Sequence, residues 1–360
     1  GQQYQYIAVG TGITTPPQMY TSGGDPQRPT GRFLLLSLTL NQDTGRVEVR
    51  RRFKIACDAP VYSVAQYGEH SFVYSAGPYV HMKSLKDCLE TKKIADVART
   101  YIRSPAVRIT VEEPHINLSC AEDSLLVLTF DPTTSSLTES FSDEVARPGF
   151  FHTPLSPGLI LTTDKNYGLV GLLRPEHPSA LQSLVTVFDA ELASSISRVR
   201  KGRCRAPWSR ANCALPGGDR DTASSMALIA GGIDGSFYQL TLLTRPAVRL
   251  LKIVQQVYER RKQRYAFVPP SAANGATWDP QDAHVDGDLL APVLRLERGW
   301  LEREVGGDGA VRAAFEGVVR RVWRGYGEGG EVVMGEGIQG DNVCAWVEEW
   351  VRGLLVDAVL

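Results

Sequence analysis

This 360-residue sequence has almost no net charge and no long apolar run. Its 39 basic and 40 acidic residues nearly cancel, so no global field draws the chain toward nucleic acid or an anionic membrane. None of its apolar runs reaches the roughly 18 residues that a membrane-spanning helix needs. Residues 1–4 carry neither the basic region nor the apolar core of a signal peptide. With no initiator Met, the sequence reads as a piece of a longer protein.

Closely spaced cysteines are also missing, because no two of the six cysteines form a CxxC motif. Their sparseness and apolar neighbours favour free, buried thiols in a reducing compartment over a disulfide framework. Cys204 and Cys213 lie nine positions apart with no histidine nearby, which argues against a zinc site. We therefore expect neither a metal nor any other cofactor.

Motifs for catalysis are equally scarce. The Gly-Thr-Gly run at 10–12 follows a strand but opens no helix, so it lacks the setting of a dinucleotide-binding loop. The serine pairs at 194–195 and 224–225 have no Gly-x-Ser-x-Gly surroundings. His115 follows two glutamates at 112–113, but strand-end carboxylates beside one histidine usually face solvent. We predict that the protein is not an enzyme, although catalytic groups can also converge from distant strands.

The first two-thirds of the chain consists of short strand-like segments separated by turns. Many of these segments are rich in Val, Ile, Leu, Thr and Tyr, and several alternate between apolar and polar residues. The segments are 6–9, 32–40, 46–55, 61–66, 71–74, 79–84, 106–111, 116–119, 125–130, 159–162, 168–173, 184–188, 226–230 and 237–243. A sandwich closes within about 100 residues, so strands over residues 1–244 indicate a repeated, mainly β architecture.

A β-propeller is the predicted architecture of residues 1–244. A blade takes about 40–45 residues, which gives five to six blades. No WD or kelch signature is visible, so we expect the repeat to be structural and not legible in the sequence. The incomplete count also fits a ring closed by strands from outside the chain. Two stretches interrupt the strands, a proline-rich insertion at 16–32 and a polar, mobile loop at 198–221.

Residues 245–360 are predicted to form a small helical domain. Apolar residues recur at helical spacing after Pro246 up to residue 262. Residues 274–282 read as a polar linker. Asp286 is a suitable cap for a helix from Leu289 onward, with Pro292 in its first turn. Further helices are expected at 310–323 and from about 341.

The order of these segments resembles one family. "YIAVGTG" (6–12) followed by "GRFLLLSL" (31–38) is similar to a strand pair of the CPSF-A group, and residues 59–85 are similar to the three strands that follow. "GGIDGSFYQLTLL" (231–243) resembles the strand that ends that group's propeller, and "VDGDLLAPVL" (285–294) resembles its "DGDLIE-x-FL" helix start. The chain departs from the pattern in a weak strand after Pro148 and in expanded stretches at 198–221 and 325–340.

The CPSF-A group contains the large damaged-DNA-binding protein, the cleavage and polyadenylation scaffold, a splicing-factor scaffold and fungal ubiquitin-ligase and heterochromatin relatives. The resemblance, of a fungal type, implies a nuclear propeller that holds other protein subunits of a large complex. That complex is either a cullin-type ubiquitin ligase in DNA repair or chromatin, or an RNA-processing assembly. Whether DNA or RNA is touched directly or through partners stays open.

Two basic segments are the candidate contact sites for nucleic acid or a partner. In the first, at 198–210, six basic residues occur without an acid, and a tryptophan stands beside them: Arg198, Arg200, Lys201, Arg203, Arg205, Arg210 and Trp208. The cations could bind phosphates, and the indole could stack on a base. The alternative, which we favour, is a solvated insertion.

The second basic segment is the helix predicted at 245–264, which holds seven basic residues and one acid, Glu259. Residues 281–360 hold 15 acidic and 8 basic residues, a net charge of −7. We favour an intramolecular role, in which the basic helix packs beside the acidic domain. Trp346 and Trp350, at helical spacing, are predicted to belong to the core and not to a partner interface.

These observations lead to a hypothesis of a non-enzymatic protein-interaction scaffold. Exposed loops on a rigid ring can hold partner proteins while the core stays unchanged. Direct nucleic-acid binding through 198–210 and 245–264 is the alternative hypothesis.

Overall fold

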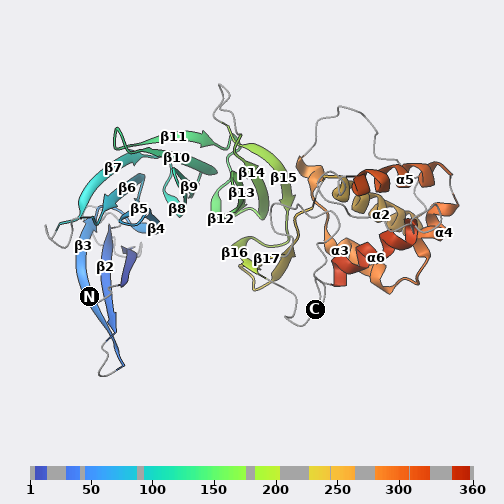
Figure 1. The fold of residues 1–360 in the computed structure, drawn as a ribbon, viewed down its shortest axis with the longest axis horizontal. Coiled ribbons are helices and arrows are strands. Elements are labelled where there is room, and N and C mark those ends of the chain that lie inside the picture. Colours follow the sequence, from blue (N-terminus) through green and yellow to red (C-terminus); the bar gives the residue numbers. More distant parts are fainter. Residues whose placement is uncertain are drawn as a thin grey trace, which may run out of the picture. The chain divides into compact units, whose positions relative to one another are not determined.

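The structure is a computed structural model, shown in Figure 1. It describes residues 5–13, 30–40, 45–86, 93–175, 183–202, 227–243, 245–263, 280–307, 309–324 and 343–356. The chain divides into two compact units. One consists of Gly1–Thr186 with Glu191–Ser197, and the other of Val187–Ala190 with Arg198–Leu360.

Five antiparallel sheets form the β part of the described chain, and in each the strands follow one another in chain order. The three four-stranded sheets are β4 (Val61–Tyr67), β5 (Ser71–Ala76), β6 (Tyr79–Ser84) and β7 (Ala95–Tyr101); β8 (Ala106–Glu112), β9 (His115–Cys120), β10 (Leu125–Asp131) and β11 (Ser136–Ser142); and β12 (Gly149–Ser156), β13 (Leu159–Asp164), β14 (Gly168–Leu173) and β15 (Val185–Glu191). The three-stranded sheets are β1 (Gln5–Ile13), β2 (Thr30–Leu40) and β3 (Val47–Cys57), and β16 (Ile196–Gly202), β17 (Ala227–Gly232) and β18 (Phe237–Leu240).

Successive sheets pack in the manner of propeller blades. First strands lie side by side, β4 against β8 and β8 against β12, and the outer strands β7 and β11 are also neighbours. Apolar side chains such as Ile109, Ile116 and Leu118 fill the space where sheets meet. Meandering sheets with neighbouring first strands are typical of propeller blades. The predicted fold class, a mainly β propeller-type architecture with helices at the C-terminus, is therefore confirmed.

The repeat is structural, as expected, and the structure shows which single positions of successive sheets correspond. The fifth residues of β5, β9 and β13 are Ser75, Ser119 and Thr163, and they follow one another at intervals of 44 residues. All three are buried, and each makes a hydrogen bond through its hydroxyl to the first strand of the next sheet. A hydroxyl in a buried strand needs a hydrogen-bond partner. These repeated positions therefore fix each sheet to the next one.

Prolines mark the starts of the same sheets. Pro60, Pro105 and Pro148 immediately precede β4, β8 and β12, and each carbonyl accepts a hydrogen bond from the residue that follows the second strand of its sheet. Proline suits the first residue of a strand because its nitrogen has no proton to donate there. The repeat therefore consists of single positions and not of a continuous motif.

Three strands were missed by sequence analysis, β7, β11 and β16, and β12 was noted only as a weak strand after Pro148. The outer strands β7 and β11 are partly exposed and polar, so they lack the apolar alternation used to find strands. Pro154 interrupts the pattern of β12 and lies at an irregularity in its pairing with β13. The prediction of a loop from residue 198 was wrong, because β16 extends to Gly202.

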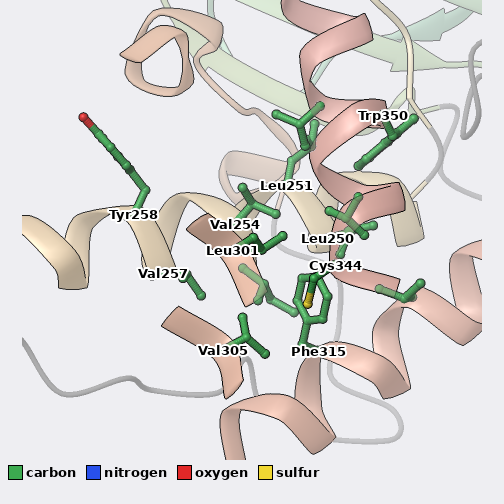
Figure 2. Close-up of a cluster of buried hydrophobic side chains, with 14 of the residues drawn as sticks. Leu250, Leu251, Val254, Val257, Tyr258, Leu301, Val305, Phe315, Cys344 and Trp350 are labelled. Atoms are coloured by element: carbon green, nitrogen blue, oxygen red, sulfur yellow. The ribbon is translucent and has the colours of Figure 1, made fainter. Parts of the chain in front are cut away.

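The helices pack around a core of their own (Figure 2). They are α2 (Arg245–Gln263), α3 (Gly287–Leu290), α4 (Trp300–Gly306), α5 (Gly309–Arg324) and α6 (Val343–Val356), with 3₁₀ turns η2 (Pro280–Ala283) and η3 (Ala291–Arg295). Leu250, Leu301, Phe315 and Val347 are fully buried in this core. Because α2 is apolar along one side only, it buries that side against α4 and α5.

Most helix predictions are confirmed, with two corrections. Asp286 caps α3 as predicted, accepting a hydrogen bond from the backbone N–H of Asp288 (2.9 Å). The helix expected from Leu289 onward is only a short α3 that continues as the 3₁₀ turn η3, because Pro292 cannot extend the hydrogen-bond ladder. Helix α4 was missed. Residues 16–29 of the insertion predicted at 16–32 and residues 274–279 of the linker predicted at 274–282 lie outside the described residues.

No helix among the described residues has both the length and the apolar character to cross a membrane.

Candidate interaction surfaces

The basic segment at 198–210 is described only in its first part. Arg198 and Arg200 are exposed and flank the buried Val199, so both lie on the outer face of β16. Lys201 belongs to the same strand. Arg203, Arg205, Trp208 and Arg210 lie outside the described residues. The structure thus brings two of the predicted contact residues together on one strand face.

The cations of α2 lie around a helix whose apolar side is already occupied. Ala247, Leu250 and Ile253 are completely buried, whereas Arg249 and Arg261 are exposed. Arg261 forms an ion pair with Glu304 of α4, with 3.8 Å between Nε and Oε1. Partly exposed pairs of this kind contribute little stability, on the order of 0–1 kcal/mol. The contact nevertheless agrees with the intramolecular role favoured for this helix.

The tryptophans of α6 belong to the helical core, as predicted. Trp350 is buried, and Trp346 packs beside it with the two rings parallel and their centroids 6.0 Å apart. Neither indole is presented as an isolated, exposed anchor.

His115 and its neighbouring glutamates are engaged in structural contacts. The imidazole is half-buried at the start of β9 and makes a hydrogen bond of 2.9 Å with the Thr129 hydroxyl. Burial, and secondarily the positive charge of Arg174, lowers the pKa of His115. Glu113 accepts a hydrogen bond from the Gly68 N–H, and Glu112 accepts one from the Asn117 amide. These groups hold strands and turns in place.

A serine, a histidine and a threonine that sequence analysis did not single out lie within hydrogen-bond distance of one another. His152 of β12 contacts the Ser119 hydroxyl through Nδ1 (2.6 Å) and the Thr110 hydroxyl through Nε2 (2.7 Å). Ser119 and His152 are 0% exposed, so no substrate can reach the hydroxyl. Burial, with a smaller effect of Arg108, lowers the pKa of His152 to about 3. The imidazole is therefore neutral, and it fastens β12 to β8 and β9.

Three cysteines fall in the described part of the chain, and all three are free thiols, as expected from the sequence. Cys120 and Cys344 are buried, and this burial raises the pKa of each thiol to about 12. A thiol of that pKa stays protonated near neutral pH and is a poor nucleophile. Among the described residues, no group of three or more His, Cys, Asp or Glu side chains is arranged to hold a metal ion. Cys204 and Cys213 are outside that part.

A further basic surface lies on the first sheet. Strand pairing places Lys54 opposite Leu34 and Arg51 opposite Leu36, and Arg32 lies two positions before Leu34. The three cations are therefore exposed on one face of β2 and β3, beside a row of half-buried leucines. Within the described residues, none of the three forms an ion pair with a carboxylate. The signal in the sequence was the run Arg50-Arg51-Arg52, which was treated only as part of a strand.

Two comparisons with known proteins bear on this architecture. The family model described as "CPSF A subunit region" matches residues 1–294. The "Uncharacterized protein C3H8.05c" of Schizosaccharomyces pombe is 25% identical over 232 residues, which are 60% of this chain and 20% of that protein. The chain thus spans about a fifth of the length of this relative.

Proposed function

Because this chain belongs to the CPSF-A family, we propose that it is a non-enzymatic scaffold of a nuclear multi-subunit complex. Members of this family generally act as scaffolds in multi-subunit complexes, in DNA-damage binding or RNA processing. The complex proposed here is a cullin-type ubiquitin ligase in DNA repair or chromatin, or an RNA-processing assembly. Its partners are other protein subunits.

The observation that carries this proposal is the series of sheets fastened to one another over most of the matched region. The hydroxyls of Ser75 and Thr163 each donate to a backbone carbonyl of the next sheet, and His152 joins two strands of one sheet to the next sheet. These contacts hold the sheets in a fixed arrangement, and the turns between strands can then vary without disturbing the core. A rigid support with variable loops is suited to binding partner proteins in fixed positions.

The Ser119–His152 pair shows why an enzymatic role is not proposed. A nucleophile and its base must lie within reach of a substrate as well as of each other. Here the pair is sealed between strands, and its histidine is too weak a base at neutral pH. That the protein is not an enzyme nevertheless stays a prediction.

Affinity purification of the tagged protein from nuclear extract, followed by mass spectrometry, tests the scaffold function. Cullin-ligase subunits, polyadenylation factors and splicing factors are mutually exclusive results, and each would identify the complex. A matched control is a chain carrying Leu118→Asp, which places a charge at a fully buried position of β9 and should disrupt the sheets. Two results would argue against the proposal. One is that the folded and the disrupted chain recover the same proteins, and the other is that no protein is recovered in stoichiometric amount.

Direct nucleic-acid binding is the second candidate function, and the two exposed basic faces favour it. They are formed by Arg198 and Arg200 on β16, and by Arg32, Arg51 and Lys54 on the first sheet. Fluorescence anisotropy with labelled DNA and RNA between 50 and 200 mM salt separates the candidates. Binding led by phosphate contacts must weaken steeply over this range and be lost in the double variant R198E/R200E or in R51E/K54E. A scaffold that acts only through proteins shows no salt-sensitive binding.

A further inference from the structure

The outer strand β7 has one edge that no other described strand occupies. It is the last strand of its four-stranded sheet and, within the described chain, it is paired only with β6 (Figure 1). On its inner side, Val97 and Ala98 pack against the buried cluster that contains Leu137 of the neighbouring strand β11. The opposite face carries Arg99 and Tyr101, and both of these residues are exposed. A partner can therefore reach this face of β7 together with its outer edge.

The strand pairing shows which backbone groups lie free on this edge. Just beyond the strand ends, the N–H of Ile102 donates to the carbonyl of Pro78 (2.8 Å), so these two residues form a hydrogen-bonded pair. Antiparallel pairs alternate between the hydrogen-bonded and the non-hydrogen-bonded kind. The next pair, Tyr101 with Tyr79, is therefore of the non-hydrogen-bonded kind, and so is the pair that contains Arg99. It follows that the N–H and C=O groups of Arg99 and Tyr101 point outward, away from β6.

The side chains beside these backbone groups form an ordered aromatic and cationic surface. The guanidinium of Arg99 lies over the ring of Tyr79, with 3.8 Å between Cζ and the ring centroid. The ring of Tyr101 meets that of Tyr79 edge-on, with the centroids 5.7 Å apart, and Tyr101 is 64% exposed. Because the cation already rests on an aromatic face, less side-chain freedom is lost when a partner binds to it.

The charge of this surface is positive. Arg103, two residues beyond Tyr101, is also exposed, and within the described residues neither Arg103 nor Arg99 forms an ion pair with a carboxylate. The one acid of β7, Asp96, is already paired with Lys83. The outer strands β11 and β15 carry acidic side chains instead of exposed arginines. A partner that fits the face of β7 must therefore supply negative charge.

We infer that the edge of β7 binds an extended, acidic segment of a partner protein as an added strand of this sheet. The segment pairs with the outward N–H and C=O groups of Arg99 and Tyr101, in the manner by which exposed sheet edges bind peptides. Its alternate residues then lie on the face that carries these two side chains, and acidic residues there meet the cations. A nucleic-acid strand would match the charge but has no groups that continue a β-ladder, so the open edge favours a peptide.

This inference rests on the proposed scaffold function, because it names one surface that holds a partner, but it can be tested on the purified chain. The probe is a fluorescein-labelled peptide of about eight residues in which glutamate and threonine alternate, a typical length for a strand. The control peptide carries N-methyl groups on the amides of its glutamates. It keeps the charge of the probe but loses the donors that would pair with Arg99 and Tyr101. Fluorescence anisotropy should show saturable binding of the probe and at least about 10-fold weaker binding of the control.

Variants of the chain separate the contribution of charge from that of backbone pairing. Arg99→Glu should weaken binding of the acidic probe by about 10-fold or more, because it sets like charges side by side. Arg198→Glu makes the same change at an exposed position of β16 and should leave binding unchanged. Tyr101→Pro removes an outward N–H that has no partner in the sheet, so the strand tolerates it, and it should weaken binding more than Tyr101→Ala. Circular dichroism establishes that each variant is folded.

Several results would overturn the inference. They are no saturable binding up to about 1 mM probe, equal binding of probe and N-methylated control, and equal binding by the parent chain and Arg99→Glu. Tighter binding of single-stranded DNA or RNA that Arg99→Glu abolishes would overturn it in favour of nucleic acid. A dimer by light scattering that Arg99→Glu disrupts would do so in favour of a second copy. In affinity purification from nuclear extract, recovery of every subunit by the Arg99→Glu chain would overturn the inference and leave the scaffold function standing.

Discussion

At the scale of single residues, His152 has hydroxyl neighbours like those of a catalytic histidine, but its role is to join strands through hydrogen bonds. Its two nitrogens are both engaged, by Ser119 on β9 and by Thr110 on β8. A neutral imidazole has one donor and one acceptor, so the two hydroxyls satisfy it completely. A charged imidazole would be costly at a fully buried position, and this explains the direction in which its pKa is lowered.

Replacement of this side chain should destabilise the sheets strongly. His152→Ala leaves a cavity and two buried hydroxyls without their partner, which should cost about 3 kcal/mol. Urea unfolding followed by tryptophan fluorescence or circular dichroism measures the loss. The matched control is His70→Ala, because the His70 side chain is exposed and its Nε2 lies 3.7 Å from the exposed carboxylate of Glu69. That control should stay within about 0.5 kcal/mol of the parent chain, and an equally small effect of His152→Ala would contradict the fastening role.

The same histidine should make folding sensitive to acid. Its folded pKa of about 3 lies below the ordinary value of 6.5, so the unfolded chain takes up a proton where the folded chain does not. This contribution is fully present above pH 6.5 and is lost as the pH falls toward 3, by at most about 1.4 kcal/mol per pH unit. His152→Gln retains a hydrogen-bonding side chain that does not titrate. Unfolding free energies measured from pH 6 to pH 4 should fall less steeply for this variant, and parallel slopes would refute the assignment.

At the scale of elements, the structure shows what a sequence pattern can and cannot reveal. The bounds of β6 and β14 were predicted as observed, because β14 is an apolar run with four successive buried residues and β6 places the buried Val80 and Met82 in alternation with half-buried residues. The outer strand β11, with the sequence Ser-Leu-Thr-Glu-Ser-Phe-Ser, gave too weak a signal since only part of it contacts the core. Of the candidate contact residues, Arg198 and Arg200 are exposed on β16 and not in a loop, and their role as contacts stays a prediction. The run Arg50-Arg51-Arg52 signalled cations on β3, but which cations share a face with Arg32 depends on strand register, which the sequence alone does not give.

Helix α4 illustrates an element fixed by a neighbour and not by its own sequence. Its start carries no side-chain cap, and the preceding Gly299 adopts a positive φ of 81°. The carboxylate of Glu348, on α6, accepts hydrogen bonds from the N–H groups of Gly299 (2.9 Å) and Leu301 (2.7 Å). A carboxylate at a helix N-terminus satisfies free donors and interacts favourably with the helix dipole.

Removing that carboxylate should loosen α4. Glu348→Ala leaves two N–H groups without an acceptor and should cost about 2–3 kcal/mol, since hydrogen bonds to charged groups are the stronger ones. The adjacent Glu349 supplies the control, because its side chain is 70% exposed and faces Arg298 at 3.7 Å in an exposed pair. Glu349→Ala should change the unfolding free energy by less than about 0.5 kcal/mol. Thermal unfolding measures both variants, and equal effects would show that the cap contributes nothing specific.

At the scale of the whole molecule, the two compact units raise the question of where the β part ends. The sequence predicted a boundary between residues 244 and 245, whereas the contacts group β17 and β18 with the helices. Phe315 is fully buried in the helical core and Leu118 is fully buried between sheets, so each reports on one unit. Each replacement by alanine should cost about 2–5 kcal/mol in its own unit.

Hydrogen exchange in these two variants locates the boundary. If the contact grouping reflects cooperativity, Phe315→Ala will speed exchange in β17 together with α2 and α6, while β9 and β13 stay protected, because amides open in cooperative units. Leu118→Ala will have the opposite effect. Faster exchange of β17 in Leu118→Ala alone would instead support the boundary at 244. It would mean that the last sheet opens together with the other sheets and not with the helices.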